Sequence, residues 1–218
     1  MNHPTNNLKR LTLEFIASAP DLKHCPSAQG PEVAIAGRSN AGKSSVLNQL
    51  SGNRRTAKVS KTPGRTQLLN FFKLIVPGMS LQGTLVDLPG YGFAKAGRSS
   101  QIKWQQSVNH YLANRDPLVG VVMVTDIRHP GQPLDLDLIN WAQESEIPLH
   151  ILLNKADKLK FGPQKQALNQ AVAALATPTV TIQLYSAQTG LGQDDLIARL
   201  LSWLDAPPAF KSDHSLTP

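Results

Sequence analysis

Apolar residues along this chain follow two alternating patterns, and each pattern predicts a different secondary structure. Short apolar runs bounded by turn residues indicate strands, and several are continuous enough to be buried on both faces, as in parallel sheets. Between them, apolar residues recur every three or four positions, which is the spacing of a helix with one buried face. The expected strands are residues 32–36, 68–76, 81–86, 118–125, 149–153 and 179–184. The expected helices are one that follows residues 37–45 and ends near 51–52, and others over 99–114, 134–144, 162–175 and 193–204.

This alternation predicts an α/β fold with a six-stranded, mainly parallel sheet, helices on both faces and right-handed crossovers. A turn at Pro77 and Gly78 joins two strands into a hairpin, which supplies one antiparallel strand. Residues 11–19 end at Pro20 and fit either an edge strand or a short helix, and the pattern does not choose between them.

Length and composition fit one soluble domain with a sizeable core, since the chain has 218 residues and is 41% apolar. We expect this domain over residues 12–205, between flexible tails at 1–11 and 206–218. The single cysteine, Cys25, excludes a disulfide within the chain and fits a reducing cytoplasm. The first residues show no signal-peptide pattern, and the apolar run 119–124 is too short to span a bilayer. We therefore expect a cytoplasmic monomer.

Residues 37–45 (Gly-Arg-Ser-Asn-Ala-Gly-Lys-Ser-Ser) lie between a strand and a helix, which is the context that a phosphate-binding loop requires. The glycines at 37 and 42 permit a tight turn and bring backbone N–H groups close to a di- or triphosphate, where the helix N-terminus adds positive charge. Lys43 can reach the β- and γ-phosphates, and the Ser44 hydroxyl can bind Mg²⁺. The alternative is a chance glycine-rich turn, which the complete pattern and its context disfavour.

Two further residues suit a metal-dependent switch. Asp87 closes a strand and precedes Gly90, so its carboxylate can hold a Mg²⁺-bound water while the Gly90 N–H contacts a γ-phosphate. Thr66 ends an irregular loop and can supply a second hydroxyl ligand, which would couple the order of that loop to the γ-phosphate. An ordinary turn and a solvated threonine are the alternatives.

The segment Asn154-Lys-Ala-Asp157 follows a buried strand and predicts the nucleotide base. The Asp157 carboxylate can accept hydrogen bonds from the ring N–H and the exocyclic amino group of guanine, and adenine offers no such pair. Asn154 can contact the other base edge and brace the phosphate loop, while the Lys155 stem can cover the base face. Ser186-Ala187 offers a backbone N–H to guanine O6. The alternatives are a surface turn with a salt bridge and, least favoured, an ATPase.

These motifs all follow predicted strands, so they should converge at the carboxyl edge of the sheet. Together with Thr-Pro-Gly-Arg-Thr-Gln at 62–67 and Asp-Leu-Pro-Gly-Tyr-Gly at 87–92, they resemble the EngB (YsxC/YihA) family of small bacterial P-loop GTPases over about residues 12–205. The resemblance implies a G domain that assists large ribosomal subunit assembly and is needed for normal septum formation in cell division. Family members usually have threonine where this chain has Asn154, and asparagine is the commoner GTPase form, so guanine selection is retained.

The resemblance also implies the residues that act on the nucleotide. Hydrolysis would involve Lys43, Thr66, Gly90 and Asn40, and Mg²⁺ would be held by Ser44, Thr66 and, through water, Asp87. The residues expected to contact GTP or GDP are Gly37, Arg38, Ser39, Asn40, Ala41, Gly42, Lys43, Ser44, Ser45, Gly64, Arg65, Thr66, Gln67, Leu68, Asp87, Leu88, Pro89, Gly90, Asn154, Lys155, Ala156, Asp157, Tyr185, Ser186 and Ala187.

One position departs from the Ras-type mechanism. There, a glutamine follows Asp-x-x-Gly and orients the attacking water, whereas this chain has Tyr91, which has no amide. We therefore expect slow intrinsic hydrolysis. Asn40 resembles the loop asparagine of GTPases that use K⁺ in place of an arginine finger, and a K⁺ there would neutralise developing charge. Equally, Asn40 could simply fit the turn of the loop.

A formal charge of +7 favours polyanionic partners, with RNA ahead of a membrane surface. The loop 53–66 is basic and contains no acidic residue, which favours contact with rRNA of the large ribosomal subunit or its precursor when GTP orders the loop. Alternatively, these charges only keep the loop solvated. Two functions therefore remain open: a GTP-switched assembly factor, and a nucleotide-regulated protein-binding module that acts directly on division with little catalysis.

Overall fold

The computed structural model describes residues 11–52, 68–76, 82–91 and 108–205, and the tails proposed above fall almost entirely outside these ranges. The strands in these ranges are β1 (Thr12–Ala19), β2 (Glu32–Gly37), β3 (Leu69–Ile75), β4 (Gln82–Asp87), β5 (Leu118–Asp126), β6 (Leu149–Asn154) and β7 (Val180–Leu184). The helices are α1 (Lys43–Ser51), α3 (Pro133–Glu144), α4 (Phe161–Leu175) and α5 (Gln193–Asp205), with short 3-10 turns at Leu22–His24 and Ala156–Lys158. Residues 108–114 are also helical, as the pattern over 99–114 predicts.

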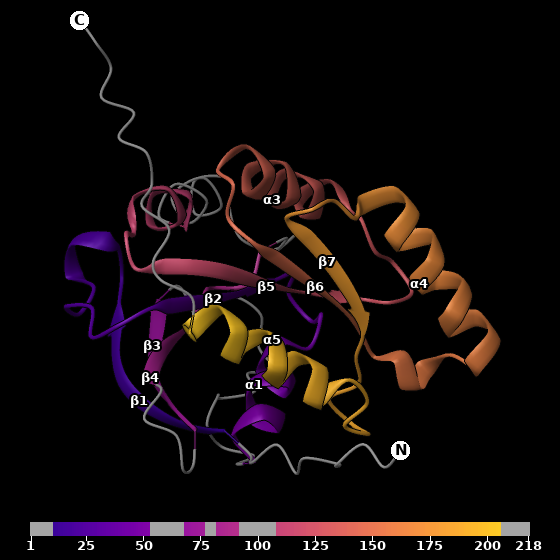
Figure 1. The fold of residues 1–218 in the computed structure, drawn as a ribbon, viewed down its shortest axis with the longest axis horizontal. Coiled ribbons are helices and arrows are strands. Elements are labelled where there is room, and N and C mark those ends of the chain that lie inside the picture. Colours follow the sequence, from indigo (N-terminus) through magenta and orange to yellow (C-terminus); the bar gives the residue numbers. More distant parts are fainter. Residues whose placement is uncertain (1–10, 53–67, 77–81, 92–107, 206–218) are drawn as a thin grey trace, which may run out of the picture.

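All the strands form one sheet in the order β1-β3-β4-β2-β5-β6-β7 (Figure 1). Strand β3 pairs antiparallel with both β1 and β4, and the remaining neighbours pair in parallel, so the prediction of a single antiparallel strand is confirmed. The predicted strand count of six is wrong, because the segment left open in the sequence forms the edge strand β1. Its pairing with β3 is a long-range contact interrupted by an irregularity between Phe15 and Ala17, which a local pattern does not reveal.

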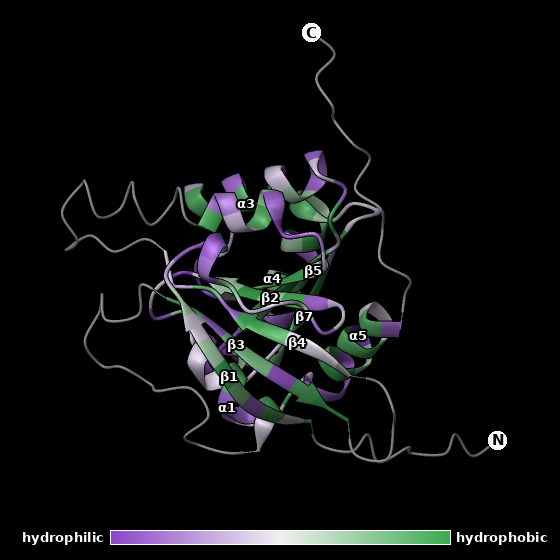
Figure 2. Ribbon diagram, turned by 90° about the vertical axis from the view of Figure 1, so that its left-hand side faces the viewer, coloured by the Kyte–Doolittle hydropathy of each residue, from purple (hydrophilic) through white to green (hydrophobic). Residues whose placement is uncertain are grey.

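Alternating side chains along the strands fill two apolar layers, one on each face of the sheet. On β2, Ala34 and Ala36 join the layer that includes α3, whereas Val33 and Ile35 join the layer under α1 and α5. Figure 1 shows this division of the helices, and Figure 2 shows the central strands in the hydrophobic colour. Helix α5 packs so closely that a Cβ on Gly120 would lie 2.6 Å from the Trp203 ring. The expected arrangement of helices on both faces is therefore confirmed.

A buried charged network closes the amino end of the sheet. Glu32 begins β2 with 1% of its surface exposed, and Arg115 binds both of its carboxylate oxygens, at 2.9 Å from Nε and 2.6 Å from Nη2. The Tyr111 hydroxyl donates to the same carboxylate at 3.0 Å, and Arg115 also donates to the Pro26 carbonyl at 2.8 Å. The guanidinium lies 5.7 Å from the centroid of the Phe71 ring. This end is therefore tied together by groups that satisfy one another.

The opposite, carboxyl end of the parallel strands collects the loops that carry the predicted motifs. Strands β2, β4 and β6 end at Gly37, Asp87 and Asn154, which are motif residues in each case. None of the helices within the described ranges is both long enough and apolar enough to cross a membrane.

Candidate functional site

The loop between β2 and α1 has the backbone shape of a phosphate cradle. Asn40 and Gly42 have left-handed φ angles of 65° and 99°, and Gly42 caps the N-terminus of α1 immediately before Lys43. A Cβ on Gly42 would collide with the side-chain amide of Asn154. The loop therefore requires glycine at 42 for two reasons, its φ angle and the close approach of a second motif.

The segment after β4 is hydrogen-bonded directly to this loop. Ser39 N–H donates to the Tyr91 carbonyl at 2.8 Å, and Tyr91 N–H donates to the Gly37 carbonyl at 3.2 Å. A Cβ on Gly90 would lie 3.3 Å from the Ser39 hydroxyl, so Gly90 lies flush against the loop. The structure thus brings together the first two motifs that the sequence predicted.

Two features of the cradle point to an anionic ligand that binds together with a cation. Lys43 and Asp87 form an ion pair in which both side chains are largely buried, 11% and 8% exposed. The Ser39 hydroxyl is buried and has no hydrogen-bond partner in the part of the chain that the structure describes. A bound phosphate can form an ion pair with Lys43 in place of Asp87. The Asp87 carboxylate would then be available to a metal-bound water. Among the described residues, no three His, Cys, Asp or Glu side chains cluster as a metal centre.

The third motif braces the cradle. Asn154 Nδ2 donates to the Ala41 carbonyl at 2.8 Å, and Ala187 N–H donates to Asn154 Oδ1 at 3.3 Å. The predicted contact between Asn154 and the loop is therefore confirmed. Lys155 Nζ donates to the Asn40 carbonyl at 2.6 Å and forms an ion pair with Asp126 at 3.1 Å. Asn154 and Lys155, at the end of β6, thus connect the loop after β2 with the end of β5 and with the loop after β7.

Asp157 presents its carboxylate beside the fourth motif. The Ser186 hydroxyl donates to Asp157 Oδ1 at 2.7 Å, and this bond holds the pKa of the carboxyl below its usual range. Ser186 is itself fixed, because it is fully buried and Thr189 N–H donates to its hydroxyl at 3.2 Å. An ionised carboxylate held in this way is an acceptor for two neighbouring donors on one ligand edge.

The remaining predicted residues divide into those the structure describes and those it does not. Ser44 and Ser45 lie in the first turn of α1. Leu88 follows the last residue of β4 and is buried. The Tyr185 carbonyl accepts a hydrogen bond from Ala156 N–H at 3.0 Å. Leu68 immediately precedes β3, and 39% of its surface is exposed. Arg38 and Pro89 lie in the loops after β2 and β4. Gly64, Arg65, Thr66, Gln67 and the basic loop 53–66 lie outside the described ranges.

The sequence did not reveal the partner of Tyr91. Its hydroxyl donates to Asp135 Oδ1 of α3 at 2.8 Å, and burial raises the pKa of the Tyr91 phenol well above its usual range. Thr125 of β5 also donates to Asp135, at 3.4 Å. Asp135 follows Pro133 by two residues, and an acidic residue at the start of a helix suggests a capping role. That pattern does not indicate a contact with Tyr91.

Known proteins resemble this chain in sequence. A family model described as the 50S ribosome-binding GTPase matches residues 32–155. A probable GTP-binding protein EngB of Vibrio vulnificus is 50% identical over 191 residues, which cover 87% of this chain and 86% of that protein. A protein of the same name from Aeromonas hydrophila is 44% identical over 217 residues, 98% of each chain.

The fold agrees with a solved structure described as a probable GTP-binding protein engB. The TM-score is 0.62 at 22% identity, and the match covers 79% of this chain and 98% of that one. Identity at this level shows the shared P-loop GTPase fold, while the family follows from the sequence matches. The chain therefore belongs to the EngB family of GTP-binding proteins.

Proposed function

We propose that this protein is a guanine-nucleotide switch that binds GTP with Mg²⁺, hydrolyses it slowly to GDP and phosphate, and acts in assembly of the large ribosomal subunit. The observation that carries the proposal is the position of Asp157. Its carboxylate, whose pKa the Ser186 hydroxyl lowers, lies at the same sheet edge as the phosphate loop, and Asn154 links that loop to Ala187, the residue next to Ser186.

The cradle would hold the phosphates through the backbone N–H groups of residues 37–45 and through Lys43. Lys43 would give up its ion pair with Asp87 and bind the phosphates instead. Ser44, Thr66 and, through a water, Asp87 would hold the metal, whose charge neutralises the phosphate oxygens when it is bound. The Gly90 backbone, already flush against the loop, would contact the γ-phosphate.

Asp157 would select guanine because its carboxylate accepts from both the ring N–H and the exocyclic amino group. Ala187 N–H, which donates to Asn154 here, would serve guanine O6. Lys155 already reaches across to Asn40, so its stem is suitably placed to lie along the base.

Slow turnover is supported by the environment of Tyr91. Its hydroxyl is bound to Asp135 of α3, so neither an amide nor this phenol is available to orient an attacking water. The hydrolytic residues would then be Lys43, Thr66, Gly90 and Asn40. For Asn40 the left-handed φ of 65° suits asparagine and supports a role in the turn. A K⁺ held there is a separate proposal, which equal GTP turnover in KCl and NaCl would remove.

The ribosomal partner rests on the family model, described as 50S ribosome-binding, and on the basic loop 53–66. A monomeric protein in the cytoplasm, with a loop that GTP orders against rRNA, would fit that role, and defects in septum formation would follow from its loss. The family membership supports this proposal ahead of a division regulator with little catalysis. Co-sedimentation with large ribosomal subunits that depends on GTP would separate the two.

The guanine proposal is tested with Asp157→Asn. We expect GTP affinity to fall by about a hundredfold or more, because the amide presents a donor to the guanine amino group. Affinity for XTP should rise, since xanthine has a carbonyl there. Asp116→Asn, an exposed carboxylate at the amino end of the sheet, is the matched control and should change neither affinity. Unchanged GTP affinity in Asp157→Asn, measured by titration calorimetry, would overturn the assignment.

A further inference from the structure

Tyr91 touches the phosphate loop through its backbone and α3 through its side chain. Its N–H and carbonyl are bonded to Gly37 and Ser39 at 3.2 and 2.8 Å, on either side of one residue of the loop. Its hydroxyl is bonded to Asp135 at 2.8 Å, and the residue is 6% exposed. Since Gly90 immediately precedes it, the position of Gly90 depends on how residue 91 is held.

Asp135 is a well-anchored partner for this hydroxyl. It is fully buried, and its second oxygen accepts from Gln132 N–H at 3.2 Å and from the Thr125 hydroxyl at 3.4 Å. The Gln132 contact belongs to the capping box that begins α3. The carboxylate is thereby fixed to both β5 and α3, so a bond to Asp135 ties Tyr91 to the rigid part of the fold.

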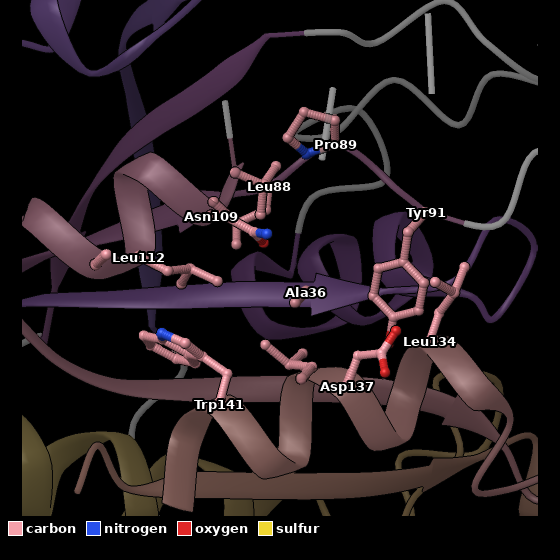
Figure 3. A pocket seen from close by; sticks show the side chains of 12 residues that line it. Ala36, Leu88, Pro89, Tyr91, Asn109, Leu112, Leu134, Asp137 and Trp141 are labelled. Carbon is pink, nitrogen blue, oxygen red and sulfur yellow. The ribbon is translucent and has the colours of Figure 1, made fainter. Parts of the chain in front are cut away.

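The side chain of Tyr91 borders a cavity. It forms one end of a cavity of about 250 Å³ between α3, residues 108–113 and the end of β4, with Trp141 and Leu112 toward the other end (Figure 3). A ring that borders a cavity has space into which it can shift. Among the contacts of the described residues, the hydrogen bond to Asp135 is directional and favours one position of the ring.

We propose that Tyr91 and Asp135 are a positioning pair that preorganises the Gly90 backbone against the phosphate loop for contact with a γ-phosphate. This inference rests on the proposed GTP switch. It assigns to Tyr91 a role in distinguishing the two nucleotides, because GDP has no γ-phosphate and gains nothing from Gly90. A preorganised contact binds more tightly than one that must be ordered on binding.

The test is the affinity of nucleotide-free protein for a non-hydrolysable GTP analogue and for GDP, both with Mg²⁺. Tyr91→Phe should weaken the analogue by about five- to tenfold, the effect of one charge-assisted hydrogen bond partly expressed in binding. GDP affinity should change less than about twofold on the same reasoning. A purely structural role would lower stability and leave the ratio of the two affinities unchanged.

The chain supplies a matched control at the other end of the sheet. Tyr111 is also buried and donates to a buried carboxylate, Glu32, at 3.0 Å. Tyr111→Phe should lower stability but leave the ratio unchanged. Asp135→Asn keeps an oxygen for Tyr91 and should shift the ratio in the same direction by less, and it replaces Tyr91→Phe if that variant does not fold.

The outcomes separate this inference from the function on which it rests. Wild-type protein that binds neither nucleotide would overturn the proposed function. Wild-type protein that binds both, together with an unchanged ratio in Tyr91→Phe or an equal shift in Tyr111→Phe, would overturn the positioning pair alone.

Discussion

The two ends of the sheet use the same kinds of buried charged groups in opposite ways. At the amino end, Glu32 is bound by Arg115 on both oxygens and by Tyr111, so the two charges of this buried network are fixed partners. At the carboxyl end, Lys43 and Asp87 have each other, but the neighbouring Ser39 hydroxyl has no partner within the described ranges. A network whose hydrogen bonds are complete without a ligand stabilises the fold. A network in which a ligand can replace an existing partner can also bind that ligand.

The backbone shows the same contrast. Of the non-glycine residues with positive φ in the described part of the chain, Asn40 and Lys155 lie at the carboxyl edge and bond to each other there. Sparsely populated backbone conformations of this kind cost free energy and persist where the surrounding structure enforces them, often at functional sites. If the two ends differ in this way, substitutions at the amino end should change stability, and substitutions at the carboxyl end should change nucleotide binding.

The largest effect on stability is expected at the amino end, from Arg115→Met. Removing the guanidinium leaves Glu32 buried and uncompensated, which should lower the free energy of unfolding by about 3–5 kcal/mol. Urea denaturation measures this loss. Nucleotide affinity of the folded protein should stay unchanged, and a parallel loss of affinity would contradict the separation of the two ends.

The pair Glu32→Gln and Arg115→Met sharpens this result. With both charges removed, no charge is left unpaired, so most of the lost stability should return. If the double variant were as unstable as the single one, the arginine would act through packing on Phe71 instead of through the carboxylate.

The next effect is expected at the carboxyl end, from Gly42→Ala. A Cβ would meet the Asn154 amide and would also be strained at φ 99°, so we expect a loss of about 1–3 kcal/mol in stability. GTP and GDP affinities should both fall by about tenfold or more, because the cradle must open to accommodate the methyl group.

Gly131→Ala is the control for backbone strain. Gly131 also has a left-handed φ, 68°, but a Cβ there would meet nothing within 4 Å. Its stability cost should be about 1 kcal/mol with unchanged nucleotide affinity. Equal affinity losses in the two alanine variants would show that the cradle at Gly42 has no special geometry.

The sequence predicted the parts of the site that local motifs encode. The glycine loop, Asp87 and the Asn154–Asp157 segment could each be placed, because each follows a strand and strand ends converge at one edge. The edge strand β1 could not be assigned, since what makes it a strand is its pairing with β3, which is distant in the chain: Ala19 pairs with Leu69 and Thr12 with Ile75. The partner of Tyr91 was missed for a similar reason, because Asp135 reaches it only through the packing of α3 on the sheet.

The smallest effect is expected from Ser186→Ala, and it should appear mainly as a change in pH dependence. The Ser186 hydroxyl stabilises the ionised Asp157 and so lowers its pKa. A lowered carboxyl pKa keeps the acceptor ionised as the pH falls, and guanine binding is lost only when the pH drops through that pKa.

Removing the hydroxyl should raise the pKa of Asp157 toward its ordinary value, so the variant should lose GDP affinity at a higher pH than the wild type. At pH 7 the two proteins should differ by only about twofold, because the carboxylate is ionised in both. Calorimetric titrations with GDP from pH 7 downward measure the shift, and ionisation of the nucleotide cancels in the comparison. Ser202→Ala, which removes an exposed hydroxyl of α5, is the matched control. Coincident pH profiles for all three proteins would show that Ser186 holds the loop after β7 without tuning Asp157, and the carboxyl end would then owe its guanine acceptor to Asp157 alone.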